Sequence, residues 1–220
     1  PLTMVKILRI ICLHGYRDNA EEFSLGLDEM RKWTENTAEL IAVNGNEHNK
    51  FEYSWYPLRF DHPGSEEEIE TSQHEWLQKG ITILEDFIIQ KGPFDGILGL
   101  SQGALFATLV LQLLRMQALD PSADTKGLTI SPSLNCFEFA LLFCPWEVQN
   151  PEKIHFETPK VAIPTLIGFG RFDAMIPYSE ATKYERLFEN AEVHFFEGVH
   201  FVPMDPKFSP ILTKFLNKFL

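Results

Sequence analysis

Short apolar runs alternate with longer amphipathic segments from one end of the chain to the other. The apolar runs have the length of buried strands and stop at Gly, Pro or Asn, as strands within a sheet do. The longer segments repeat apolar residues at helical spacing, as in 20–34. The pattern predicts strands at residues 6–13, 39–43, 95–100, 137–144, 163–169 and 192–197, and helices at 20–34, 65–91, 102–119, 178–190 and 206–220.

Two segments follow neither pattern. Residues 44–64 are rich in Asn, Pro, Gly and aromatic residues, and residues 120–136 are polar, so both are predicted to be loops. Ser65 is expected to cap the helix that follows 44–64, whose first turn is acidic, as the helix dipole favours. A loop as long as 44–64 is uncommon in compact domains and is often functional.

Strands that alternate with helices indicate an α/β fold. Helical connections let neighbouring strands run parallel, so we expect a mostly parallel, doubly wound sheet with helices on both faces. Ligands in such folds bind beyond the carboxyl ends of the strands, and catalytic residues are expected there. Residues 1–220 show no repeat or linker and are expected to form a single domain; Pro1 to Thr3, before Met4, are interpreted as residues left by cloning.

The composition narrows the classes of function. Hydrophobic residues make up 45% of the 220 residues, which is enough for a sizeable core, and the net charge of −12 without a Lys/Arg block disfavours nucleic acid as a partner. The apolar runs Ile7–Leu13 and Ala104–Leu114 fall short of the ~20 residues that span a bilayer. Lys6 and Arg9 interrupt the first strand pattern, so no signal peptide is evident. We therefore expect a cytoplasmic protein without a membrane span.

The three cysteines are Cys12, Cys136 and Cys144. An odd number without metal-ligand spacing argues against a disulfide framework and against a zinc site. We interpret all three as reduced thiols in the core, where free cysteine packs as a small hydrophobic residue. No metal site is predicted.

The segment Gly99-Leu100-Ser101-Gln102-Gly103 matches the pattern G-x-S-x-G between a predicted strand and a predicted helix. A sharp turn from strand to helix exposes the serine, and the two glycines remove Cβ atoms that would clash in the turn. The serine then lies at a helix N-terminus, where backbone N–H groups favour negative charge. The context predicts that Ser101 is a nucleophile.

A serine hydroxyl needs a base, and the base needs an acid that orients it. Where a nucleophile follows this strand–turn–helix pattern, the chain order is Ser, then Asp or Glu, then His. Asp173 comes directly after the predicted strand 163–169, and His200 comes after 192–197. We therefore predict that Ser101, Asp173 and His200 form a catalytic triad. The alternatives are a histidine within the last strand and three carboxylates at less suitable places, namely His194, Asp120, Asp124 and Asp205.

An oxyanion hole is expected beside Ser101. In this arrangement an N–H from a loop after an early strand joins the N–H of the residue after the nucleophile. The predicted donors are the backbone N–H groups of Tyr16 and Gln102. Gly15 allows the backbone to approach the substrate closely, and His14 is expected to brace the loop rather than act as a base.

At these residues the sequence resembles the FSH family of serine hydrolases, a branch of the α/β-hydrolases that includes esterases and thioesterases. The resemblance spans nearly the whole chain and implies an α/β-hydrolase fold without a separate lid domain, with Ser101, Asp173 and His200 in the triad roles. It departs from the family at Val199, where the family usually has a second glycine, and after the fourth strand. The matching segments are 11–16, 92–104 and 198–203.

The predicted chemistry is hydrolysis of a small-molecule carboxylic ester through an acyl-serine intermediate, without a metal or organic cofactor. Two alternatives remain. One is a thioesterase that releases acyl groups from CoA or a carrier protein. The other is a catalytically silent hydrolase fold that serves as a binding module, although a binder has no need of Ser, Asp and His at these places. The sequence does not indicate the oligomeric state.

Large aromatic residues crowd the predicted loop 44–64 and the segment after the fourth strand. They provide either an apolar wall for an acyl chain or anchors that hold the loop on the sheet, and the sequence leaves both interpretations open. The candidate substrate-binding residues are Trp55, Tyr56, Phe60 and Trp146.

Overall fold

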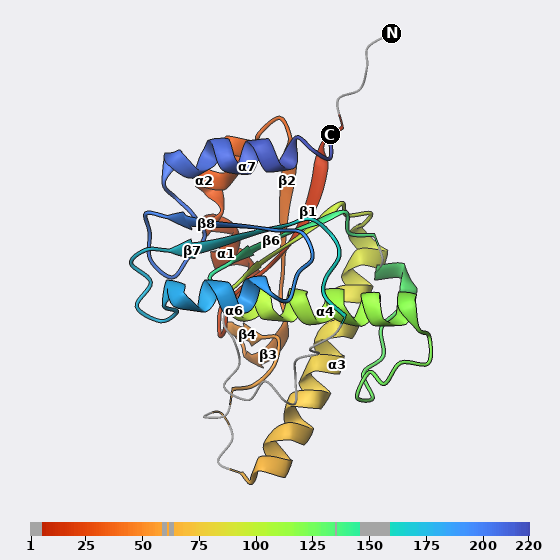
Figure 1. Ribbon diagram of the computed structural model, residues 1–220. Helices are drawn as coiled ribbons and strands as arrows, with labels where there is room; N and C mark the ends of the chain where they lie inside the picture. Colours follow the sequence, from red (N-terminus) through yellow and green to blue (C-terminus); the bar gives the residue numbers. More distant parts are fainter. Residues whose placement is uncertain (1–5, 59–60, 62–63, 135, 146–158) are drawn as a thin grey trace.

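A parallel sheet forms the centre of the computed structural model, which describes residues 6–58, 61, 64–134, 136–145 and 159–220 (Figure 1). Within these residues the sheet has six strands in the order β2-β1-β5-β6-β7-β8, and every neighbouring pair is parallel. The predicted α/β architecture is confirmed. The strands are β1 (Leu8–Leu13), β2 (Ala38–Val43), β5 (Gly96–Leu100), β6 (Phe139–Phe143), β7 (Thr165–Gly170) and β8 (Ala191–Phe196).

The register of the sheet brings distant loops to one edge. Leu13, the last residue of β1, pairs with Gly99 of β5, and Leu100 pairs with Phe143, the last residue of β6. Gly170 at the end of β7 pairs with Phe196 at the end of β8. Because all these strands are parallel, the loops that follow them meet beyond the same edge.

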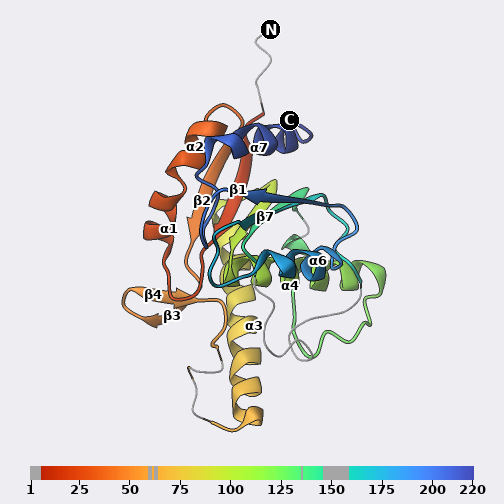
Figure 2. The ribbon, with the colours of Figure 1, turned by 60° about the vertical axis from the view of Figure 1, so that its left-hand side comes forward.

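Helices cover both faces of the sheet (Figures 1 and 2). The first face packs against α1 (Ala20–Gly26), α2 (Asp28–Thr34) and α7 (Ser209–Leu216) through a core that includes Phe23, Met30 and Leu212. The second face packs against α3 (Glu66–Lys91), α4 (Gln102–Leu119) and α6 (Ala181–Glu185). Burial of apolar surface on both sides explains why β5, β6 and β7 are buried at every position and show no alternation.

The helix predicted at 20–34 is two helices, because the chain turns at Leu27. Gly26 is a weak helix former, and a Cβ atom there would lie 2.4 Å from Cζ of Phe201. The backbone therefore runs directly against the Phe201 ring at the end of α1. Phe23 and Met30 are nevertheless both buried, as the helical spacing predicted.

The prediction of a loop throughout 44–64 was wrong. Residues Asn46–Asn49 and Glu52–Ser54 form an antiparallel hairpin, β3 and β4, which lies beside α3 (Figure 2). Its inward side chains Asn46 and Ser54 are buried and polar. The hairpin therefore lacks the alternation of apolar and polar residues that identifies a strand in a sequence.

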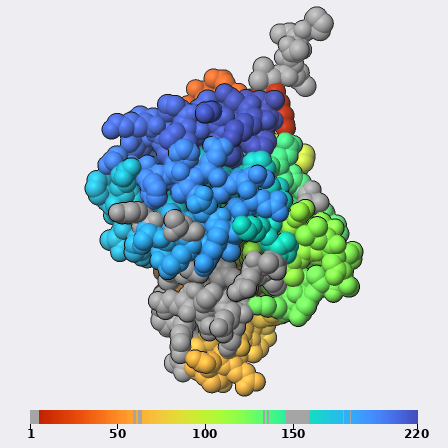
Figure 3. Space-filling model, viewed as in Figure 1, coloured from red at the N-terminus to blue at the C-terminus, as the bar shows by residue number. Residues whose placement is uncertain are grey.

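The other predicted helices differ mainly in length. Ser65 caps the start of α3, as expected, and also forms a capping box with Glu68. The first turns of α3 project beyond the sheet layers (Figures 1 and 3). The helices predicted at 178–190 and 206–220 are shorter, because three-residue turns flank α6 and α7. None of the helices in the described ranges has both the length and the apolar character needed to cross a membrane.

Candidate active site

Ser101 lies at the sharp turn between β5 and α4. Its φ of 53° and ψ of −115° are sparsely populated for a residue with a Cβ atom, and its N–H donates to the carbonyl of Phe143 at 2.9 Å. A Cβ atom on Gly103 would lie 2.3 Å from the carbonyl oxygen of Leu13, and one on Gly99 would lie 2.5 Å from the backbone of Ala104. The two glycines of the motif are therefore needed for the close packing of this turn.

His200 lies between Asp173 and Ser101. Its Nδ1 is 2.7 Å from Oδ2 of Asp173, and its Nε2 is 2.9 Å from Oγ of Ser101. The Asp173 side chain is fully buried and the His200 side chain is 16% exposed. The other oxygen of Asp173 accepts the N–H groups of Met175 and Ile176, both at 2.8 Å. All three residues predicted for the triad thus lie within hydrogen-bond distance in one chain of contacts.

The loops that carry Asp173 and His200 run directly against each other. A Cβ atom on Gly170 would lie 2.4 Å from the carbonyl oxygen of Val199, and the N–H of Phe172 donates to Gly198 at 2.9 Å. These contacts follow from the pairing of β7 with β8. The acid and the histidine are therefore positioned mainly by the backbone.

Cys144 packs against the loop that carries His200. It follows β6 with a φ of 45°, and its thiol is 3.4 Å from the carbonyl oxygen of Phe201 and 4.0 Å from that of Val199, on either side of His200. Burial raises the pKa of the thiol to about 12. Cys144 is a buried neutral thiol, as predicted, and its contacts with the His200 loop could not be found from the sequence.

Potential metal ligands come together at this same place. Atoms of Cys144, Asp173 and His200 lie within 4.8 Å of one another, and no other group of this kind occurs in the described residues. The 2.7 Å separation of His200 Nδ1 from Asp173 Oδ2 is a hydrogen-bond distance, shorter than the roughly 3.3 Å between two ligand atoms of a tetrahedral zinc site. We therefore assign these atoms to a hydrogen-bonded group.

The predicted oxyanion donors lie on the loops that meet at Ser101. Gln102 begins α4, so its N–H has no partner four residues earlier in the helix. Gly15 faces the nucleophile, because a Cβ atom there would be 3.9 Å from Cβ of Ser101. The N–H of Tyr16 belongs to the next residue of the same loop. The two predicted donors thus belong to the start of α4, directly after Ser101, and to the loop after β1, which passes close to Ser101.

His14 braces the loop after β1, as predicted. Its Nε2 accepts the N–H of Gly45 at 3.0 Å, so its Nδ1 carries the proton and donates to the carbonyl of Gly15 at 2.7 Å. Complete burial lowers the pKa of His14 to about 4. His14 is a neutral structural residue.

The side chain of Gln102 was not predicted to have a role. Its oxygen accepts the N–H of Trp55 at 2.9 Å, and its amide group donates to the carbonyl of Tyr56 at 2.7 Å. The residue after the nucleophile therefore holds the backbone of the loop after β4. No sequence pattern predicts such contacts, because the partners of the Gln102 side chain are backbone groups 46 and 47 residues away.

The candidate substrate-binding residues have different surroundings. Trp55 and Tyr56 are both 0% exposed; the Trp55 ring stacks on Phe106 and its N–H donates to the carbonyl of His14. The hydroxyl of Tyr56 has no hydrogen-bond partner among the described residues. These contacts favour an anchoring role for Trp55 and leave the role of Tyr56 open. Phe60 and Trp146 lie outside the described residues.

The alternative residues lie in other environments. His194 is within β8, with its ring against Phe208. The three carboxylates cap local turns: Asp120 accepts from Ser122, Asp124 from the N–H of Lys126, and Asp205 from the N–H of Lys207.

Comparison with known families gives a match over nearly the whole chain. The family model described as serine hydrolase (FSH1) matches residues 4–210. This range contains Ser101, Asp173 and His200.

Curated relatives and solved structures are also similar. Esterase OVCA2 of Homo sapiens is 29% identical, and the alignment covers 96% of this chain and 96% of that protein. A Schizosaccharomyces pombe protein named dihydrofolate reductase is 24% identical over 97% of this chain, but the chain spans only 48% of its length. The crystal structure of the Bacillus cereus carboxylesterase superimposes with a TM-score of 0.62 at 16% identity, covering 98% of this chain and 90% of that chain. At this identity the structural likeness supports the fold.

Proposed function

Because the chain belongs to the serine hydrolase (FSH1) family, we propose that it hydrolyses carboxylic esters through an acyl-enzyme on Ser101. Its α/β-hydrolase fold, which the family resemblance implied, is shared with solved esterases. The observation that carries the proposal is the contact of one imidazole with both a buried carboxylate and the serine at the strand–helix turn.

In the first proposed step, His200 Nε2 takes the proton of Ser101 while Oγ attacks the ester carbonyl carbon. The carbonyl π electrons move to the oxygen, where the N–H groups of Tyr16 and Gln102 stabilise the negative charge. Asp173 accepts the Nδ1–H bond and stabilises the imidazolium. The proton then passes from Nε2 to the leaving alcohol as its bond to carbon breaks.

In the second step, water replaces the alcohol. His200 takes a proton from the water, the hydroxide oxygen bonds to the acyl carbon, and the carboxylic acid leaves as Ser101 regains its proton. Neither step requires a metal or an organic cofactor. The same steps cleave a thioester if a thiol takes the place of the alcohol, so the leaving group distinguishes the esterase from the thioesterase.

The test combines covalent labelling with turnover. A fluorophosphonate probe should label the wild type and not Ser101→Ala, whereas the exposed Ser122→Ala is the matched control and should label normally. A panel of p-nitrophenyl esters and acyl-CoAs of graded chain length should show turnover that Ser101→Ala lowers by about 10⁴-fold or more. Turnover by Ser101→Ala within tenfold of the wild type would contradict the proposal, and preference for acyl-CoAs would favour the thioesterase.

A further inference from the structure

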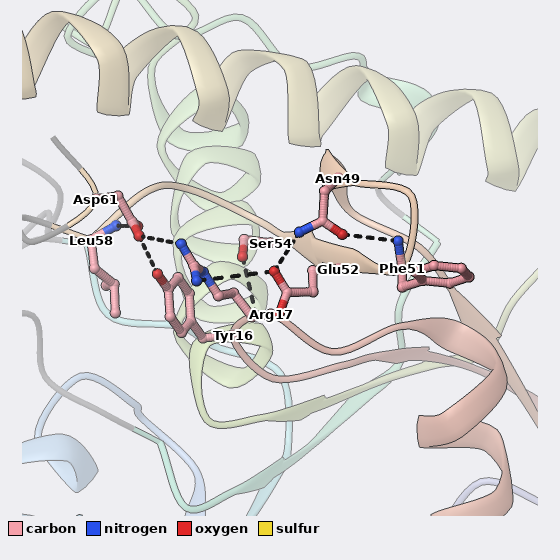
Figure 4. A network of polar contacts seen from close by, with 8 residues as sticks. All are labelled: Tyr16, Arg17, Asn49, Phe51, Glu52, Ser54, Leu58 and Asp61. Atoms are coloured by element: carbon pink, nitrogen blue, oxygen red, sulfur yellow. Dashed lines mark hydrogen bonds and ion pairs between the residues drawn. The ribbon is translucent and has the colours of Figure 1, made fainter.

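A nearly buried carboxylate, that of Asp61, lies in the segment between β4 and α3. The Asp61 side chain is 5% exposed. One of its oxygens accepts hydrogen bonds from the hydroxyl of Tyr16 and from Nη2 of Arg17, the latter at 3.1 Å, and the other oxygen accepts from the N–H of Leu58 at 2.7 Å (Figure 4). We call Tyr16, Arg17, Leu58 and Asp61 the loop clasp. A carboxylate loses much hydration when it is buried, and these three donors compensate for that loss.

The loop clasp joins two segments that are far apart in sequence. Tyr16 and Arg17 follow Gly15, which faces Ser101, whereas Leu58 and Asp61 belong to the loop after the hairpin. Tyr16 supplies one of the two proposed oxyanion N–H groups. Its own side chain therefore ties that backbone position to the carboxylate of Asp61.

The backbone of Arg17, the residue after Tyr16, has an unfavourable conformation. Arg17 has a φ of 53°, in the left-handed region that a residue with a long side chain seldom adopts. Its N–H donates to Oγ of Ser54 at 3.2 Å, and its guanidinium lies 5.5 Å from the centre of the Tyr16 ring. Such a backbone stays in place only where surrounding contacts hold it, and Asp61 accepts from the side chains of both residues.

We infer that Asp61 is a positioning residue that fixes the oxyanion N–H of Tyr16 through the loop clasp. The inference rests on the proposed function, since it concerns the same site. Asp61 acts on the transition state through the backbone of Tyr16 and has no contact with the reacting atoms. Displacement of an oxyanion donor lowers kcat, because the donor matters most when the carbonyl oxygen becomes negative.

Asp61→Asn tests this directly. All three partners of Asp61 donate hydrogen bonds, and an amide has only one accepting oxygen. In the variant the amide N–H group therefore faces a second donor, which is either the N–H of Leu58 or the guanidinium of Arg17. Tyr16→Phe is the second variant; it removes one hydroxyl and keeps the backbone N–H. Glu52→Gln is the matched control, because Glu52 also lies beside Arg17, at 4.0 Å, but is 38% exposed and does not contact Tyr16 in the network of Figure 4.

The measurements are kcat, KM and the Ki of a trifluoromethyl ketone. The ketone carbon bonds to Oγ of Ser101, the proton passes to His200, and the carbonyl oxygen becomes an anion in the oxyanion hole. We expect Asp61→Asn and Tyr16→Phe to lower kcat by about 10- to 100-fold and to raise Ki by a similar factor, with KM within about threefold. The double variant should lose little more than Asp61→Asn alone, since both act through one contact. Glu52→Gln should match the wild type.

Two results would overturn the inference. One is a kcat and a Ki within twofold of the wild type in Tyr16→Phe. The other is a lower melting temperature in Asp61→Asn with unchanged kcat and Ki, which would make Asp61 only an anchor of the loop. If Asp61→Asn does not fold, Tyr16→Phe alone decides. An inactive wild type would instead contradict the proposed function, so the two failures are distinguishable.

Discussion

The two sides of the site are held in different ways. On one side Ser101, Asp173 and His200 each follow the end of a parallel strand, and backbone contacts such as Ser101 N–H to Phe143 and Phe172 N–H to Gly198 set their positions. On the other side the loop after the hairpin is held by side-chain contacts, chiefly those of Gln102 with its backbone and those of its own Asp61 with Tyr16 and Arg17.

This difference determines how each side responds to mutation. A backbone-held residue can be exchanged for one of the same shape without loss of the fold, so its chemistry can be tested alone. A side-chain contact supplies both the position and the stability of the loop it holds, so its loss affects both. The predictions below separate these two behaviours.

The largest expected effect is on the acid. In Asp173→Asn the amide oxygen can still accept from Met175 and Ile176, so the loop should keep its shape. The amide N–H group would then face Nδ1 of His200, which must accept and therefore moves its proton to Nε2. Nε2 can no longer take the proton of Ser101. We expect kcat/KM to fall by about 10⁴-fold, or ~5 kcal/mol, with little change in melting temperature.

The control for this prediction is Asp205→Asn. Asp205 also follows β8 but only caps a local turn, through its contact with the N–H of Lys207. Its kcat/KM should stay within threefold of the wild type. An active Asp173→Asn enzyme would mean that another carboxylate orients His200.

The next largest effect is expected on protein stability, through the loop after the hairpin. Gln102→Met keeps the length of the side chain but leaves the N–H of Trp55 and the carbonyl of Tyr56 buried without partners. We expect the free energy of unfolding to fall by about 2–4 kcal/mol, and the melting temperature by roughly 5–10 °C. Urea denaturation and thermal unfolding measure these two quantities.

Gln78 offers a matched control for that substitution. It makes the same pair of bonds, to the N–H and carbonyl of Thr129, at 2.8 and 3.0 Å, but in an exposed place where water can replace them. Gln78→Met should therefore cost less than 1 kcal/mol. If the free energy of unfolding falls equally in the two variants, burial does not add to the value of the Gln102 hydrogen bonds.

The strand-anchored side could be predicted from the sequence. The positions of Ser101, Asp173 and His200 could be recognised because each follows a run with the length of a strand that ends at a turn, and the parallel order of strands then brings the loops together. Residues 102–119 were likewise predicted as one helix and form α4 with the same bounds.

The loop side could not be predicted in the same way. The strands β3 and β4 bury Asn46 and Ser54, so their sequence lacks an apolar period. The contacts of Gln102 with Trp55 and of Asp61 with Tyr16 join residues that are distant in sequence, and their value depends on burial that only the folded structure reveals. The contact of Gly26 with the Phe201 ring, next to the break at Leu27, likewise joins residues that are distant in sequence.

A smaller effect is expected on the free energy of unfolding when the pH is lowered. His14 stays neutral in the folded protein down to a pKa of about 4, whereas in the unfolded chain it takes up a proton near 6.5. Between these values the unfolded state binds more protons, so stability falls as the pH falls and the loss is complete below about pH 4. At pH 5 this one residue should account for about 2 kcal/mol.

His14→Gln tests that contribution, because glutamine can donate to Gly15 and accept from Gly45 without titrating. The variant is expected to be less stable than the wild type at pH 7.5. Urea denaturation should show that its further loss between pH 7.5 and pH 5 is about 2 kcal/mol smaller than that of the wild type. Parallel pH dependence in the two proteins would mean that His14 is not the titrating group.

The smallest expected change is one of chain-length preference, and it decides whether the aromatic residues of the loop after the hairpin are anchors or a substrate wall. Trp55 has its ring stacked and its N–H bonded, so Trp55→Ala should lower the melting temperature and leave the chain-length profile unchanged. Tyr56 has a buried hydroxyl without a partner among the described residues, which would suit a side chain that borders a bound ligand. Tyr56→Ala should therefore shift kcat/KM toward longer acyl esters by about fourfold per added methylene, or ~0.8 kcal/mol. If Tyr56→Ala loses only stability and keeps the wild-type profile, both aromatic residues are anchors and the acyl wall is formed by other residues.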